Sequence, residues 1–229
     1  MINSFVVKEL ILSLGADLCG IASVDRFGDA PVGFRPTDLY PECKSVIVFA
    51  KKLPESVFYT ESTIPYSFVD DIALHEVLRL SLDIAVGLEK RNIVAVPIPS
   101  EPYDYWDKDT ITGKGLVSLK HAGYLAGLGI IGRNTLLCNP EFGNLIKLGA
   151  VLSNAELEAD PILCVDLCSD KCNLCLKSCP SGAIKESSVD QKKCRLQSEG
   201  TTKKGEPITV CNNCRRVCPN RAGWKKNVL

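Results

Sequence analysis

The sequence predicts an α+β protein of two parts: a sheet-and-helix body over residues 1–160 and a cysteine-rich module over residues 161–229. Through about residue 155, apolar patterns with helical and strand periods are mixed along the chain. Nine of the 12 cysteines then lie between Cys164 and Cys218, among lysines and short polar loops. A chain of 229 residues is long enough to bury a core in the body and to carry a small second module.

The first half of the body begins with a helix. Ser4 can cap a helix over residues 5–14, which has apolar residues at a four-residue spacing and Gly15 as its stop. Residues 25–43 lack a sustained period and are predicted to form a loop. Apolar runs and one helical stripe predict four further elements, namely strands over 18–24, 45–53 and 92–99 and a helix over 70–91.

The second half of the body contains a long polar and aromatic segment, residues 99–115. A loop of this length in a compact domain is usually functional or mobile, although a surface lid without chemistry fits the same pattern. A helix is expected over residues 116–128, ended by the glycine-rich stretch GLGIIGRN. The stretches TLLCN and LIKLGAVLS, joined through PEFG, are then predicted to pair as a hairpin.

The charges are unevenly distributed along a chain of zero net charge. Residues 161–229 carry 13 lysines and arginines against 6 acidic residues, and the body has the opposite excess. Such a basic tail could contact nucleic acid through a set of five side chains: Arg215, Arg216, Arg221, Lys225 and Lys226. The alternative is compensation for negatively charged metal clusters. The chain has no apolar run long enough for a membrane span and no basic leader, so we expect a cytoplasmic protein without a membrane partner.

The cysteines of the module form two runs, each of which ends in Cys-Pro. They read Cys168-x3-Cys172-x2-Cys175-x3-Cys179-Pro and Cys211-x2-Cys214-x3-Cys218-Pro, with Cys194 between them. In two-cluster ferredoxins, the cysteine before proline binds the other cluster. That rule predicts one [4Fe-4S] cluster on Cys168, Cys172, Cys175 and Cys218. It predicts a second cluster on Cys179, Cys194, Cys211 and Cys214.

Two alternatives concern these ligands. Structural zinc also binds Cys-x2-Cys pairs, but two runs with paired prolines favour iron–sulfur clusters. The first spacing is x3 instead of the ferredoxin x2, so Cys164 is an alternative ligand to Cys168. The remaining cysteines lie in or beside apolar stretches and are expected to be buried small hydrophobic residues: Cys19, Cys43 and Cys138.

The stretch AGLGIIGRNTLLCNPEFGNLIKLGAVLSN, followed by runs ending CPSGAI and CRRVCPN, resembles the epoxyqueuosine reductase family over most of the chain. The resemblance implies a nitroreductase-like, cobalamin-binding α+β domain and a ferredoxin-like module that supplies electrons. It also implies the crossed ligand pattern, with Cys194 as the lone cysteine. Close backbone approach to a planar cofactor would use Gly129 and Gly132, and the cofactor's polar edges would meet Arg133 and Asn134. A dinucleotide site at these glycines is not expected, because they follow a predicted helix.

Three departures from the family bear on the reaction. The family's aspartate that donates the proton falls near Gly113, the helical extension that helps grip tRNA is not expected here, and Asn220 and Arg221 follow Pro219 where the family has tryptophan. A positioned acid is worth about 10²- to 10⁴-fold in rate. No catalytic residue is therefore assigned, and the candidate replacement donors are Tyr103, Asp104, Tyr105, Asp107, Asp109 and His121.

The sequence thus predicts an oxidoreductase with two [4Fe-4S] clusters that pass electrons to a cofactor in the body. Cobalamin is the first candidate cofactor and flavin the second. Expected partners are a redox donor protein and a small-molecule substrate; queuosine in tRNA is not expected to be the substrate. The alternative is a non-enzymatic electron-transfer protein, which would have a filled interface where an enzyme has a pocket lined by residues 99–134.

Overall fold

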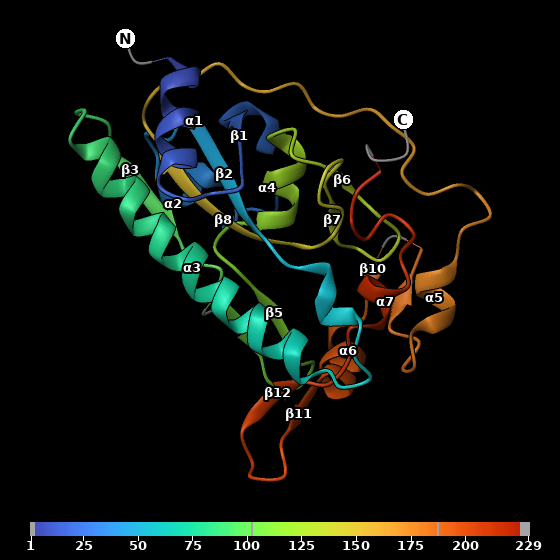
Figure 1. Ribbon diagram of the computed structural model, residues 1–229. Helices are drawn as coiled ribbons and strands as arrows, with labels where there is room; N and C mark the ends of the chain where they lie inside the picture. Colours follow the sequence, from blue (N-terminus) through green and yellow to red (C-terminus); the bar gives the residue numbers. More distant parts are fainter. Residues whose placement is uncertain (1–2, 102, 187, 225–229) are drawn as a thin grey trace.

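The computed structural model describes residues 3–101, 103–186 and 188–224 (Figure 1). The body is built on an antiparallel four-stranded sheet in the order β1-β2-β8-β3. Its strands span Leu18–Ser23, Ser45–Lys52, Ile146–Ser153 and Ala95–Ile98, respectively. Helices cover both faces of this sheet, and the two central strands, β2 and β8, are therefore largely buried.

Side chains of β2 alternate between two apolar cores, as the pleat of a strand requires. Ile47 and Phe49 pack with α1 (Ser4–Ser13) and with the C-terminal half of α3 (Ile64–Glu89). Val46 and Val48 pack on the opposite face, against α4 (Leu119–Leu125). The predicted body helices and the main strands are all present, with ends that shift by a few residues.

Helix α3 is longer than the apolar stripe predicts. It begins at Ile64 rather than near residue 70, with Pro65 in the first turn, where a proline fits because that amide has no helical partner. Its 26 residues span about 39 Å. The C-terminal half packs on the sheet, whereas the N-terminal half reaches the cysteine module, where the Ser67 hydroxyl accepts a 2.9 Å hydrogen bond from the Thr209 amide.

The predicted hairpin of TLLCN with LIKLGAVLS does not form. Instead β7 (Leu137–Cys138) pairs with β6 (Ile130–Ile131), and β8 joins the main sheet between β2 and β3. Strand β8 is apolar on both faces, which suits a central strand rather than a two-stranded hairpin. The short remaining elements of the body are η1 (Val24–Phe27), α2 (Pro36–Leu39), η2 (Glu55–Phe58), β4 (Tyr105–Asp107) and β5 (Thr112–Lys114).

The cysteine module consists of short elements beside β7 and the N-terminal end of α3 (Figure 1). They are α5 (Leu174–Ser178), β9 (Ile184–Lys185), β10 (Ser188–Val189), α6 (Gln191–Ser198), β11 (Glu199–Thr201), β12 (Pro207–Thr209) and α7 (Asn213–Arg216). Asp160 is still tied to the body, because its carboxylate accepts from Lys8 and from the Ile21 amide. None of the helices in the described ranges has the length and apolar content of a membrane span.

Candidate functional site

The two cysteine runs have the same local structure. In each, an asparagine follows the first cysteine of the Cys-x2-Cys pair, and both asparagines have nearly equal backbone angles: φ −134° and ψ 23° at Asn173, and φ −136° and ψ 18° at Asn212. Each asparagine precedes a short helix, α5 or α7, that carries the second cysteine of the pair. The repeated Cys-Asn-x-Cys sequence therefore produces two equivalent loops for presenting paired thiols.

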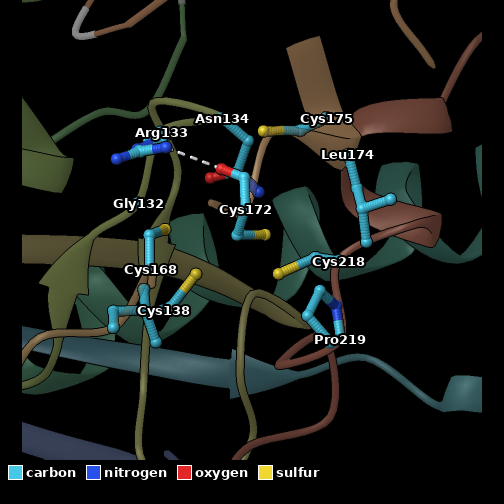
Figure 2. Close-up of a pocket in the computed structure, with 11 residues that line it drawn as sticks. Gly132, Arg133, Asn134, Cys138, Cys168, Cys172, Leu174, Cys175, Cys218 and Pro219 are labelled. Carbon is cyan, nitrogen blue, oxygen red and sulfur yellow. Dashed lines mark hydrogen bonds between the residues drawn. The ribbon is translucent and has the colours of Figure 1, made fainter. Parts of the chain in front are cut away.

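One group of cysteines lines a cavity of about 20 Å³ at the boundary with the body (Figure 2). Cys168, Cys172 and Cys175 come from the first run, and Cys218 comes from the end of the second. The walls between them are mostly apolar, formed by Leu167, Leu174 and Pro219. The structure thus brings the last cysteine of one run to the first three cysteines of the other, and four thiols in a largely apolar setting suit an iron–sulfur cluster.

The other four predicted ligands also influence one another electrostatically. Burial raises the pKa of Cys214 to about 11; Arg215 opposes this effect, and the thiolates of Cys194, Cys211 and Cys179 add to it. Burial likewise raises the pKa of Cys194, and Cys179 and Cys211 raise it further. The ligand roles of both groups remain predictions. Among the described residues, no three His, Cys, Asp or Glu side chains are close enough together to hold a single metal ion.

The loop after the first Cys-Pro is shaped to stabilise a thiolate. The amide of Ala183 donates to the sulfur of Cys179 at 3.3 Å. Burial alone would raise the pKa of Cys179, but hydrogen bonds from the amides of Ile184, Ala183 and Ser181 and from the Ser181 hydroxyl outweigh it and lower the pKa. Gly182 has φ +59°, a left-handed conformation that glycine adopts without strain. The sequence CPSGAI therefore places a set of amide donors around the sulfur of Cys179, and such hydrogen bonds are typical of cysteines that bind iron–sulfur clusters.

The body holds the loops of the cysteine runs by their backbone carbonyls. Arg133 donates to the carbonyls of Cys172 at 2.8 Å and Asp170 at 3.3 Å. Asn134 donates to the carbonyl of Cys214 at 3.3 Å, and Asn144 donates to that of Arg215 at 3.3 Å. These side chains therefore fix both cysteine runs against the body.

The same contacts bear on the four residues predicted to bind a planar cofactor. A Cβ at Gly129 would collide with the carbonyl of Cys138, and a Cβ at Gly132 would lie 2.9 Å from the Asn134 side chain and 3.4 Å from Leu167. The glycines therefore allow close packing within the protein. Arg133 and Asn134 are also engaged by the cysteine loops, and the role of the four residues as contacts of a corrin stays a prediction.

The four cysteines outside the two groups differ in their placement. Cys164 is exposed and does not line the cavity, so its position does not favour it over Cys168. Cys43 is buried, and Cys19 is half-buried beside the core. Cys138 is also fully buried, but it lines the same cavity as the first group. The spacing rules for cysteine runs miss Cys138 because it lies 30 residues before Cys168. The sequence feature that could have pointed to Cys138 is its closeness to the Gly132-Arg133-Asn134 stretch.

The 99–115 segment is attached to helix α6, which carries Cys194. Gln191 exchanges two hydrogen bonds with the backbone of Gly113, at 3.0 and 3.1 Å. The guanidinium of Arg195 lies 4.9 Å from the ring centroid of Tyr103 and 5.0 Å from that of Trp106. The hairpin of β4 and β5 therefore packs against α6, the helix that carries Cys194.

The candidate proton donors do not converge on one site. Hydrogen bonds from Thr110 and the Asp109 amide lower the pKa of Asp107, which serves to close the turn of the hairpin. The ring of His121 lies 2.7 Å from the Ser118 hydroxyl, and partial desolvation and Lys120 lower the pKa of His121. The proton donor therefore remains unassigned.

Comparison with known proteins gives a consistent result. No family model matches the chain. An epoxyqueuosine reductase from Bacillus subtilis is 26% identical over 96% of this chain and 65% of its own length. Another, from Staphylococcus aureus, is 28% identical over 65% of this chain and 39% of its own length. The solved epoxyqueuosine reductase of Streptococcus thermophilus superposes with a TM-score of 0.67 at 20% identity, covering 96% of this chain and 66% of that one.

This chain resembles the epoxyqueuosine reductases. It shares their α+β fold and also that of a catabolic reductive dehalogenase bound to 3-bromo-4-hydroxybenzoic acid, with a TM-score of 0.67 at 19% identity over 94% of this chain and 31% of that one. This chain spans less than two thirds of the length of the curated relatives named above. One epoxyqueuosine reductase of the same fold was solved with a modified tRNA-Tyr stem loop, so the expectation that tRNA is not a partner lacks support.

Proposed function

We propose that this protein is an iron–sulfur oxidoreductase that carries two [4Fe-4S] clusters and delivers electrons to a cofactor in its body. The observation that carries the proposal is the convergence of Cys168, Cys172 and Cys175 with Cys218, from a distant run, on one largely apolar cavity. The similarity to epoxyqueuosine reductases and reductive dehalogenases supports the oxidoreductase class.

The clusters fit this chain by the chemistry of its donors. Eight thiols are available as four and four, and the Ala183 amide donates to the sulfur of Cys179, the cysteine before the first proline, at 3.3 Å. Hydrogen bonds to sulfur and solvent exposure set the reduction potential of a cluster, which supplies one-electron transfer. This chain's own contribution is to position both sets of thiols against the body through Arg133, Asn134 and Asn144.

Cobalamin is the acceptor that the comparisons support best. One structure of the same fold is described as suggesting a mechanism for B12-dependent dehalogenation. Gly129, Gly132, Arg133 and Asn134 make contacts within the protein, and their role toward a corrin stays a prediction. We therefore assign no residue to the corrin and no step to it.

The acceptor is tested by titrating anaerobically purified, iron-loaded protein with hydroxocobalamin and following its absorbance after dithionite reduction. We expect saturable binding and reduction of the corrinoid by the reduced protein. A protein that retains its iron but neither binds nor reduces the corrinoid would remove cobalamin from the proposal. A yellow chromophore that fluoresces on release from the protein would assign flavin instead.

An electron-transfer protein without a reaction of its own is the second candidate. Its mark would be a filled interface where an enzyme has a substrate pocket lined by residues 99–134. An epoxyqueuosine-modified tRNA stem loop is the first substrate to assay with corrinoid-loaded protein; turnover would decide for an enzyme.

A further inference from the structure

The cavity that the first cysteine group lines has one thiol more than a cluster requires. Five cysteines line the cavity: Cys138 of the body in addition to Cys168, Cys172, Cys175 and Cys218. A [4Fe-4S] cluster takes four thiolates. Figure 2 shows the sulfur of Cys138 directed into the same space as the sulfurs of the module.

Cys138 is held there by the body. It forms β7 with Leu137 and pairs with Ile130 of β6, and its carbonyl occupies the space that the absent side chain of Gly129 leaves. Its side chain is completely buried, and its only contact with a backbone acceptor is the distant Leu136 carbonyl at 3.9 Å. The thiol lines the same cavity as Cys218 and the first three cysteines of the module, so it lies beside the predicted ligand set.

Cys168 is the member of the predicted set with the weakest sequence support. Its x3 spacing to Cys172 departs from the ferredoxin pattern, and it lies in the stretch from 161 to 173 that has no helix or strand. Cys138, Cys168 and Cys218 line the same cavity. A rigidly held thiol therefore lies next to a ligand that is held by an irregular segment.

We propose that Cys138 is a fifth thiolate donor of the first cluster, able to take the coordination position of Cys168. A cysteine of the body would then bind the cluster together with cysteines of the module. In the exchange, the Cys138 thiol would give its proton to the departing Cys168 thiolate and take over the Fe–S bond that this thiolate gives up, so the cluster would neither gain nor lose an electron. The inference rests on the proposed iron–sulfur function.

The test measures iron and acid-labile sulfide per chain in anaerobically purified single and double variants. Cys168→Ala should keep about eight irons, whereas Cys168→Ala/Cys138→Ser should fall to about four. The matched control is Cys168→Ala/Cys43→Ala, because Cys43 is a buried body thiol that does not line the cavity; it should keep about eight. Electron paramagnetic resonance of reduced Cys168→Ala should show an altered signal for one cluster.

Loss of about four irons from Cys168→Ala alone would overturn the exchange, because Cys138 would then have failed to replace the lost ligand. Retention of about eight by the Cys168→Ala/Cys138→Ser double variant would also overturn it. Circular dichroism shows whether each variant is folded, and the single variant decides even where a double variant does not fold. Wild-type protein without iron would instead refute the proposed function itself, so the two failures are distinguishable.

Discussion

At the scale of single residues, Cys194 is the one cysteine that lies between the two cysteine runs in the sequence. It lies on α6, half-buried, and the thiolates of Cys179 and Cys211 act on it. We predict that Cys194→Ser lowers the iron content from about eight to about four per chain, because serine is a poor replacement for a thiolate and only the second cluster depends on this position. Cys164→Ser, at an exposed position outside the first cavity, should keep its iron. Equal iron in the two variants would contradict the ligand assignment.

At Gly113, the ring of Tyr103 leaves no room for a side chain. A Cβ at this position would lie 2.7 Å from the ring of Tyr103. We expect Gly113→Ala to destabilise the protein by about 1–3 kcal/mol through overpacking. That cost lowers the thermal midpoint by about 2–4 °C for each kcal/mol in a chain of this size. The family's aspartate would therefore not fit here without movement of Tyr103.

A double-mutant cycle isolates this contact. In the Tyr103→Ala background, Gly113→Ala should cost much less than in the wild type, because the ring that causes the collision is gone. The measurement is the thermal midpoint of the four proteins under anaerobic conditions. Equal costs in both backgrounds would show that Tyr103 does not restrict position 113.

At the scale of elements, the hairpin of β4 and β5 packs on α6. Gln191 binds both backbone groups of Gly113, and Lys192 donates to the Asp109 carbonyl at 2.7 Å. We predict that Gln191→Ala releases the hairpin and speeds tryptic cleavage after Lys108 in the native protein. Gln197→Ala, an exposed position on the same helix, is the control and should be cleaved at the wild-type rate. Unchanged cleavage of Gln191→Ala would mean that the hairpin is held by other contacts.

Periodicity predicts the body's main helices and strands because each is long enough to show a repeated apolar pattern. The pairing of strands is a different matter. TLLCN and LIKLGAVLS are adjacent in sequence, yet β8 finds its partners in β2 and β3, far away in the chain. The central position of β8 follows from the burial of both its faces, and the local sequence does not indicate which strands lie beside it.

At the scale of the whole molecule, α3 connects the body with the cysteine module. Its C-terminal half packs on the sheet, and its N-terminal half places Tyr66 beside Arg215, whose guanidinium lies 6.0 Å from the ring centroid. Arg215 follows Cys214 of the second group and is also within electrostatic reach of Cys138 in the first. One partly buried cation therefore lies near both cysteine groups.

The candidate site was predictable where its cysteines follow a fixed spacing in the sequence. The Cys-Pro rule groups Cys218 with the first run, and the structure places it there. Cys138, Arg133 and Asn134 could not be placed in the same way, because their contacts depend on how the body meets the module. The glycines of the same stretch illustrate the difference: they suggest an approach to a cofactor, but they allow close packing of the chain on itself.

The most direct test of the account is the metal and sulfide content of anaerobically purified wild-type protein, read together with its electron paramagnetic resonance spectrum. We predict about eight irons and about eight acid-labile sulfides per chain, with the signals of two reduced [4Fe-4S] clusters that interact. Stoichiometric zinc with no acid-labile sulfide would contradict the account, because the cysteine groups would then be structural zinc sites.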